Sequence, residues 1–302
     1  MAKKERKSKV LTTDIVLVKS PELTPMGEVE GIDGKVYTLV GVDGKAVAET
    51  ESFKVFIARS ATQTGLFKIA QGPANNAELD QEANNLKLIQ QIAAEIDEET
   101  KGERKPHYGI FFPVLQEQID ADGRVGLILG FDPAIESYKR FTPVSNIAGY
   151  VDFKTLAWFL GKGLKSLGLI HDMGKKFGML DASNIFVEKE LHGVLFFNSA
   201  YMADANEAEQ LAEVAAFAQI AWTLAGGAEE SEPPFSESVM TREKHDKFVS
   251  FLNSLRVGME ASEAHEAAYQ MFDEIWPKGQ KTDEHGTVTK RDFHVWKEYD
   301  RK

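Results

Sequence analysis

The chain has 302 residues, of which 43% are hydrophobic and 27% charged, and its net charge is −12. This composition is typical of a soluble globular protein of one or two domains, and the acidic balance disfavours nucleic acid as the main partner. The sequence contains no cysteine and no run of about 20 apolar residues, which excludes disulfides, cysteine-based zinc sites and a membrane span. We expect a cytoplasmic protein.

Residues 1–25 predict a flexible basic tail. The chain begins with several lysines and an arginine that no apolar signal core follows, so we expect no export. An apolar segment at 14–19 is compatible with a short strand. The tail is interpreted either as disordered or as a docking arm for an acidic partner or a membrane surface.

Residues 26–131 have the pattern of an antiparallel sheet with one helix. Runs rich in β-branched and aromatic residues, separated by turns such as Asp43 and Gly44, predict five strands. These strands are expected at 35–42, 53–59, 66–70, 108–115 and 125–131. Between the third and the fourth strand, apolar residues three and four positions apart predict one helix. The apolar residues are Leu79, Ala83, Leu86, Ile89 and Ile92.

Residues 132–276 predict a mainly helical region. The spacing of apolar residues indicates helices at 151–169, 207–224, 244–255 and 262–275. Between the first two helices, the sequence predicts a loop and two short strands, the second at 194–197. Residues 277–302 are interpreted as a polar C-terminal tail, whose aromatic and basic end at 290–297 either docks a partner or folds back on the helices.

The loop between the first two helices carries a resemblance to a known family. Its sequence runs Phe-Gly-Met-Leu-Asp-Ala-Ser-Asn, and Gly178, Leu180 and Asn184 match the catalytic-loop pattern of protein kinases. With the order of elements, this implies a two-lobed, α+β protein kinase-like fold. Its N-lobe is a five-stranded antiparallel sheet with one helix, and its C-lobe is mainly helical. An unrelated α+β fold is the alternative.

The resemblance implies a nucleotide site in the N-lobe. Lys68 looks like the third-strand lysine that contacts the phosphates of ATP, and Glu82 resembles the helix glutamate that pairs with this lysine. Glu78, one turn earlier, is an alternative partner. Without the resemblance, Lys68 and Glu82 would be surface charges on a strand and a helix.

The resemblance also implies a metal site in the C-lobe. Asn184 would ligate magnesium in an active kinase, although an asparagine there can also cap the loop backbone. Asn198 falls where the metal-binding aspartate is expected, and Phe197 is the competing alignment. An amide is a weaker ligand for a hard dication than a carboxylate, so the resemblance implies that ATP with Mg²⁺ binds weakly or not at all.

Several features depart from the pattern of an active kinase. Met179 stands where kinases carry the catalytic aspartate, so no residue is assigned a catalytic role. The connection 42–52 has Gly44 as its only internal glycine, whereas kinases use three to close over phosphates. The stretch after Asn198 is too short for an activation segment. Phe177, Met179, Phe196 and Phe197 instead predict apolar packing.

Two further residues are interpreted as structural. His171, at the end of the first C-lobe helix, is expected to be a packed histidine rather than a base. Glu213 is the nearest candidate for the acidic residue that the central helix of the C-lobe usually carries in this fold.

These departures predict a catalytically impaired kinase-like domain, a pseudokinase that serves as a protein-binding or regulatory module. Its partner would be a protein. The alternative is a divergent active phosphotransferase or nucleotidyl transferase. In that case Lys68, Glu82 and Asn184 would hold nucleotide, and Asp181 or Asp172 would stand in as base or metal ligand.

Overall fold

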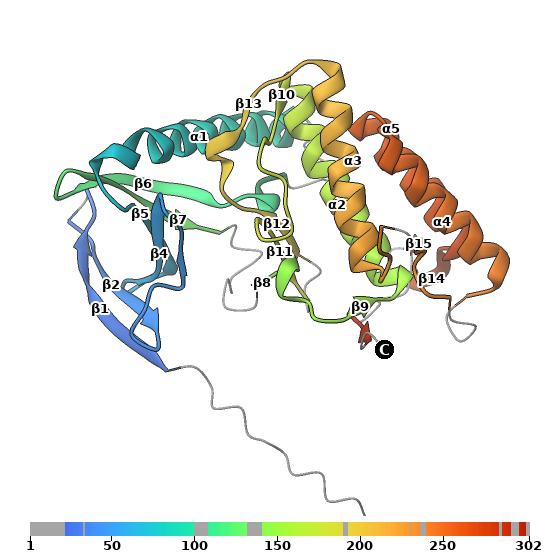
Figure 1. Ribbon diagram of the computed structural model, residues 1–302, viewed down its shortest axis with the longest axis horizontal. Coiled ribbons are helices and arrows are strands. Elements are labelled where there is room, and N and C mark those ends of the chain that lie inside the picture. The colour runs from blue at the N-terminus through green and yellow to red at the C-terminus, as the bar shows by residue number, and fades with distance from the viewer. Residues whose placement is uncertain are drawn as a thin grey trace, which may run out of the picture.

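The structure is a computed structural model that describes residues 22–32, 34–99, 108–131, 141–189, 193–229, 231–235, 240–283, 286–290 and 296–299. The apolar segment 14–19, the expected link between the lobes at Asp132 and Pro133, and Phe293 of the C-terminal tail lie outside these residues. A twisted sheet with one long helix across it lies beside a group of four helices (Figure 1). We call the sheet and its helix the N-lobe, and the group of helices with its small sheets the C-lobe.

The N-lobe sheet contains the five expected strands and two more. The expected strands are β2 (Val36–Val42), β4 (Phe53–Arg59), β5 (Thr64–Ala70), β6 (Val114–Ala121) and β7 (Arg124–Gly130). The added strands are β1 (Leu23–Glu30), which pairs with β2, and β3 (Ala48–Glu49), which pairs with β4. The order is β1-β2-β4-β5-β7-β6 and every pair is antiparallel. The sheet therefore begins within the stretch that the sequence predicted as tail.

The expected fourth strand starts later than the apolar pattern indicates. Tyr108–Phe111 forms a short 3-10 helix (η2), and β6 begins only at Val114. Pro113, directly before the strand, has no N–H to give to a ladder, which explains this boundary. Phe111 and Phe112 are buried in the core of the C-lobe instead.

Helix α1 (Asn76–Glu99) is the single helix of the N-lobe. Its buried residues include Leu79, Ala83, Leu86 and Ile89, so the predicted apolar face is confirmed. The first three join residues of the sheet and of the C-lobe, among them Val55 and Leu195, in one apolar cluster. We call this the interlobe cluster. Because it draws on both lobes, it fixes the position of α1 relative to the C-lobe.

The four predicted C-lobe helices are confirmed with small shifts at their ends. They are α2 (Phe153–Asp172), α3 (Glu207–Leu224), α4 (Arg242–Val257) and α5 (Ala261–Ile275). Asp152 caps α2 by accepting a hydrogen bond from the Thr155 N–H at 2.9 Å, and Asn206 with Glu209 forms a capping box at α3. These caps explain why both helices begin where they do.

Short strands complete the C-lobe. They form three small sheets, which are β8 (Phe141–Pro143) with β11 (Ile185–Glu188) and β12 (Gly193–Phe196), β10 (Lys175–Lys176) with β13 (Ala203–Asp204), and β9 (Tyr150–Val151) with β16 (Glu298–Tyr299). The described residues also contain the short 3-10 helices η5 (Val144–Asn146) and η6 (Ser199–Tyr201) in the C-lobe, and η1 (Pro73–Asn75) directly before α1 in the N-lobe. The strands β11 and β12 carry the loop 177–184 and Asn198 at their ends.

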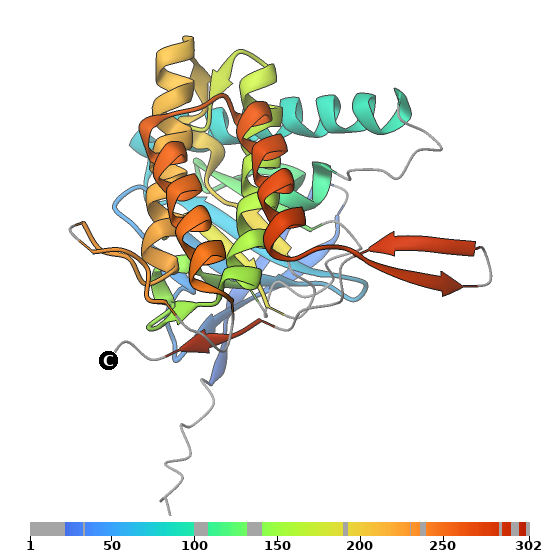
Figure 2. The same ribbon diagram turned by 90° about the vertical axis from the view of Figure 1, so that its right-hand side faces the viewer.

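One part of the described C-terminal tail extends away from the C-lobe, and another part lies against it. A hairpin of β14 (Gly279–Asp283) and β15 (Gly286–Lys290) extends away from the helices (Figure 2). After it, the ring of Trp296 lies 5.2 Å from that of Trp158, and the Lys297 N–H donates to the Thr155 hydroxyl at 3.3 Å. The folded-back interpretation of the tail therefore holds for 296–299. In the described part of the chain, no helix is long and apolar enough to cross a membrane.

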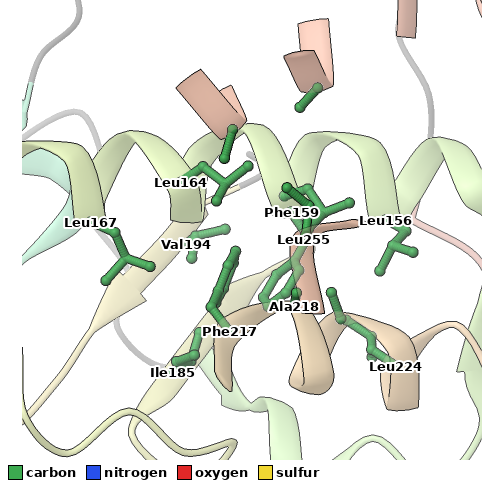
Figure 3. Packing of buried hydrophobic residues seen from close by; sticks show 14 of the residues in the cluster. Leu156, Phe159, Leu164, Leu167, Ile185, Val194, Phe217, Ala218, Leu224 and Leu255 are labelled. Atoms are coloured by element: carbon green, nitrogen blue, oxygen red, sulfur yellow. The ribbon is translucent and has the colours of Figure 1, made fainter. Parts of the chain in front are cut away.

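The core of the C-lobe is built where α2 meets α3. Side chains of the two helices interlock, with Ile185 and Val194 of the small sheet beside them (Figure 3). The rings of Phe159 and Phe217 are stacked at 5.1 Å. Gly163 gives the Phe217 ring its space, because a Cβ atom at this glycine would lie 2.0 Å from the ring.

A pair of glycine substitutions in α2 tests this packing. Gly163→Ala forces the buried Phe217 ring to move, so we expect it to lower the free energy of unfolding by about 1–3 kcal/mol. Gly168→Ala meets no atom within 4 Å and should raise that free energy by about 0.5–1 kcal/mol, because alanine is the better helix former. Urea unfolding measures both. Equal effects of the two substitutions would contradict the packing.

Candidate functional site

Lys68 is the centre of the contacts between the two lobes. It lies on β5 and Glu82 lies on α1, and both residues have an exposed fraction of 0%. The Lys68 Nζ lies 2.5 Å from the Glu82 Oε2. Loss of water lowers the pKa of Lys68, and the neighbouring carboxylate of Glu82 opposes this shift. Glu78, the alternative partner, accepts a hydrogen bond from the Tyr201 hydroxyl instead, at 2.9 Å.

Asn198 brings the C-lobe to this pair. Its Oδ1 accepts a hydrogen bond from the Lys68 Nζ at 2.9 Å, and the residue is buried at the end of β12. Its backbone is left-handed, with φ 68°, a conformation that asparagine adopts more readily than most residues. Of the two residues in the competing alignments, Asn198 is the one that is hydrogen-bonded to Lys68.

Two aromatic rings complete the surroundings of Lys68. Its Nζ lies 3.7 Å from the centre of the Phe53 ring and 5.6 Å from that of Phe197. Both rings belong to the interlobe cluster. A cation over an aromatic face is attracted by the ring, so these contacts help to hold the ammonium group. Nothing in the sequence singled out Phe53, which is simply the first apolar residue of a strand.

The loop 177–184 is anchored by Glu213 of α3. The Glu213 carboxylate accepts hydrogen bonds from the Phe177 N–H at 2.9 Å and the Gly178 N–H at 2.8 Å. It also lies 3.0 Å from the His171 Nε2. Glu213 and His171 therefore shape the loop, and this contact agrees with the structural role expected for His171.

Asn184 is not part of the Lys68 contacts. Its Nδ2 donates to the Met179 carbonyl at 3.2 Å and to the Asp181 carboxylate at 3.4 Å. Asp181 in turn accepts from the N–H and the hydroxyl of Ser183, at 2.6 and 2.5 Å. The side chains of Asn184 and Asp181 thus cap their own loop.

The expected apolar packing of this loop is right for three residues and wrong for Met179. Phe177, Phe196 and Phe197 are buried, whereas the Met179 side chain is 40% exposed. The Met179 Sδ lies 3.8 Å from the Asn198 Nδ2. Met179 follows Gly178, whose φ of 88° turns the loop outward, and this local geometry overrides the apolar character of the side chain.

The connection between β2 and β4 is closed by its own hydrogen bonds. The Val47 N–H donates to the Val55 carbonyl at 2.8 Å, and the Thr50 N–H donates to the Phe53 carbonyl at 2.9 Å. The Thr50 hydroxyl accepts from the N–H groups of Ser52 and Phe53. Because these amides already have partners, they do not form an open cradle for an anion.

The short segment after Asn198 is bound to α1. The Asn85 Nδ2 donates to the carbonyls of Ser199 and Met202, at 2.7 and 3.2 Å. The sequence gave no sign of this contact, because an asparagine inside a helix is usually exposed. It holds α1 against the C-lobe without any bound ligand.

No family model and no curated protein matches the chain. Solved structures do match it. The structure of vaccinia related kinase 3 aligns with a TM-score of 0.54 at 10% identity, covering 85% of this chain and 93% of that one. This chain has a protein kinase-like fold. The PknI kinase domain of Mycobacterium tuberculosis is also similar, with a TM-score of 0.47 at 14% identity, covering 82% of this chain and 100% of that one. At these identities the likeness establishes the fold alone.

The kinase-like fold implies a magnesium ion near Asn184 and Asn198, and the residues present do not fit one. The candidate ligands are two neutral amides, and the Asn198 oxygen is already bonded to Lys68. Magnesium prefers carboxylate oxygens in octahedral geometry. Among the described residues, no group of three or more histidine, aspartate or glutamate side chains could hold a metal ion.

The same fold implies a nucleotide whose phosphates meet Lys68, and this contact also does not fit. The ammonium group is enclosed by Glu82, Asn198 and the Phe53 ring, and the side chain has no exposed surface. A phosphate could reach it only if at least one of these groups moved. Whether Lys68, Glu82 and Asn184 ever hold nucleotide stays a prediction from the resemblance.

Substitution of the buried ion pair tests its structural role. Lys68→Met leaves the Glu82 carboxylate buried and unpaired, so we expect a loss of about 3–5 kcal/mol in the free energy of unfolding. The double variant Lys68→Met/Glu82→Leu should recover most of this loss, because the Glu82 Oε1 receives no hydrogen bond from the described residues even in the parent protein. Urea unfolding measures both.

The control for this pair is Lys87→Met, on the exposed face of the same helix as Glu82. It should change the free energy of unfolding by no more than about 0.5 kcal/mol. A double variant that is as unstable as the sum of its two single variants would show that the pair does not act as a unit.

Removal of the loop anchor is a second test. Glu213→Ala leaves the N–H groups of Phe177 and Gly178 without their acceptor, so we expect a loss of about 3 kcal/mol and faster hydrogen exchange of these two amides. Glu266→Ala, on the exposed face of α5, should change stability by no more than about 0.5 kcal/mol. Unchanged exchange at both amides in Glu213→Ala would contradict the anchor.

Proposed function

We propose that this protein is a catalytically impaired kinase-like domain, a pseudokinase that acts as a protein-binding or regulatory module. The observation that supports this most is the enclosure of Lys68. The cation that would meet phosphate in an active kinase is fully buried and bonded to Glu82 and Asn198. In this arrangement Lys68 links the two lobes, and its ammonium group has no exposed surface for a ligand.

The missing carboxylates support the same proposal. Phosphoryl transfer depends on positioning and on charge stabilisation, in which the metal ion has a large part. Met179 offers neither a base nor a ligand, and Asn198 is neutral. Asp181 is committed to the Ser183 N–H and hydroxyl, which argues against it as a substitute base. Burial raises the pKa of the Tyr108 phenol, and the negative charge of Asp172 raises it further. The Asp172 carboxylate therefore acts on a residue of η2.

A binding module needs a stable shape, and the contacts between the lobes provide one. The Lys68–Asn198 hydrogen bond, the Asn85 contacts and the interlobe cluster hold α1 in place. At the adjoining surface, Met179 and Tyr201 are 40% and 43% exposed. The backbone of Gly178, next to Met179, lies close to that of Tyr201, since a Cβ atom at this glycine would lie 2.1 Å from the Tyr201 carbonyl. This surface is suited to a protein partner.

The overall charge and composition agree with this proposal. A net charge of −12 repels the phosphates of nucleic acid, so the partner in this proposal is a protein. The absence of cysteine is compatible with a reducing compartment, and we include a cytoplasmic location in the proposal.

Thermal melting with ATP, alone and with Mg²⁺ or Mn²⁺, tests the proposal. A ligand that binds the native state raises the melting temperature, by an amount that grows with its concentration over Kd. We expect no rise in melting temperature at about 1,000 times the Kd of a micromolar site, that is at roughly 1 mM ATP. Radiolabel transfer from ATP to general acceptor proteins should also stay at background.

The opposite results would favour the active phosphotransferase. A metal-dependent rise in melting temperature that is lost in Lys68→Met and kept in Lys87→Met would show a nucleotide site around Lys68. Phosphate transfer that is lost in Asn184→Ala would overturn the pseudokinase proposal. Each variant is compared with its own nucleotide-free melting temperature, because Lys68→Met also lowers stability.

A further inference from the structure

We propose that a protein partner places a phosphorylated side chain between Lys162 and Lys165, on the face of the C-lobe where α2, α5 and η2 meet. This inference deepens the proposed function, on which it rests for the choice of a protein as the partner. It adds the chemical group that is recognised and the surface that recognises it, and it uses none of the contacts of Lys68.

Two lysines of α2 share one aromatic support. Lys162 and Lys165 are about one helical turn apart, so their side chains leave the same face of the helix. Both Nζ atoms lie 5.8 Å from the centre of the Phe111 ring, and the Lys165 Nζ lies 4.8 Å from that of the Tyr108 ring. These rings belong to η2 and attract the two cations without neutralising them.

The two ammonium groups have no direct counter-charge. Among the described residues, neither group has a hydrogen bond or an ion pair. Burial and the neighbouring charge of Lys162 lower the pKa of Lys165 to about 8, against the opposing carboxylate of Asp97, and burial lowers the pKa of Lys162 as well. In a chain with a net charge of −12, two adjacent cations are thus left to repel each other. An anion placed between them would relieve this repulsion.

His265 of α5 adds a third group that can carry a positive charge. Its Nε2 is buried and has no hydrogen-bond partner among the described residues. Burial lowers the pKa of His265, and the charge of Lys165 lowers it further, so this ring is mostly neutral at pH 7. A bound anion would counter the charge of Lys165 and favour the uptake of a proton by His265.

A cavity beside Lys162 offers room for an apolar side chain of the partner. It has a volume of about 200 Å³ and lies between α2 and α5, which pack side by side (Figure 2). The aromatic residues Trp158, Tyr269, Phe272 and Trp276 line it, and Lys162 is the only charged residue among the described ones that do. Sites for small molecules usually have volumes of roughly 300–1,000 Å³, so this cavity suits a single aromatic side chain next to the phosphate.

The charge of the site favours a phosphate monoester over a carboxylate. A phosphorylated side chain carries a charge of about −1.5 to −2 at pH 7 and three acceptor oxygens. A carboxylate has one charge and two oxygens. Each ammonium group has three donors, so a phosphate can accept from Lys162 and Lys165 at the same time.

Isothermal titration calorimetry of the full chain with a short capped peptide tests the inference. The peptide carries a phosphoserine at its centre and a phenylalanine beside it. We expect one peptide to bind per chain, with a Kd at least about tenfold lower than that of the same peptide with serine. A peptide with glutamate in place of phosphoserine, and inorganic phosphate alone, should both bind more weakly than the phosphopeptide.

Lysine variants assign the binding to this site. Lys162→Met and Lys165→Met should each weaken phosphopeptide binding about tenfold. Both should melt at or above the temperature of the parent protein, because methionine keeps the apolar stem and removes a charge that is partly buried. The matched control is Lys87→Met, which makes the same change of charge at an exposed position of α1 and should bind the phosphopeptide as the parent does.

The outcomes separate this inference from the proposed function. Absence of saturable binding, equal affinity for the phosphorylated and unphosphorylated peptides, or unchanged affinity in both Lys162→Met and Lys165→Met overturns the inference and leaves the pseudokinase proposal intact. Equal or tighter binding of the glutamate peptide or of inorganic phosphate also overturns it, because the site would then take a carboxylate or a free ion. A metal-dependent rise in melting temperature with ATP overturns the proposed function instead, whatever the peptide does.

Discussion

A single buried ammonium group organises the contacts between the lobes. Lys68 has no exposed surface, so its charge must be compensated inside the protein. Its partners come from three distant segments, Glu82 on α1, Asn198 after β12 and the Phe53 ring on β4. If Glu82 is displaced, the buried ammonium group loses its counter-charge, and if Asn198 is displaced, it loses a hydrogen-bond acceptor. The positions of the sheet, of α1 and of the segment after β12 are therefore coupled.

Under the proposed function, the same coupling sets the stability of the protein against the binding of a nucleotide. A lysine that met phosphate would have to face the cleft between the two lobes and keep part of its surface free. In this protein the group is bonded to an amide and covered by aromatic rings, which leaves the cleft apolar. Amides in the connection between β2 and β4 are likewise not open to phosphate, because they donate hydrogen bonds within the connection and to β4. Within the kinase-like architecture, the buried Lys68 links the two lobes.

Much of the fold could be predicted because it depends on periodic patterns. The apolar faces of α1 and α2 recur every three or four residues, and the ends of α2 and α3 carry capping residues that act locally. The predictions failed where a single residue or a contact between distant segments determined the start or the presence of a strand. Pro113 explains the late start of β6. The strand β1 was missed because its mostly exposed residues, with Pro25 and Gly27 among them, show no alternation, so only its pairing with β2 defines it.

The sequence by itself determined the order of the elements. It also placed Lys68 and Glu82 at the positions of the kinase lysine and glutamate, and Met179 and Asn198 where kinases carry carboxylates. These follow from residue identity and local spacing. Only the tertiary structure decided that Lys68 is enclosed, that Asn198 accepts a hydrogen bond from it, and that Asn184 caps its own loop. The physical reason is that burial and charge compensation depend on which distant segments come together, and residue spacing along one chain does not specify those distances.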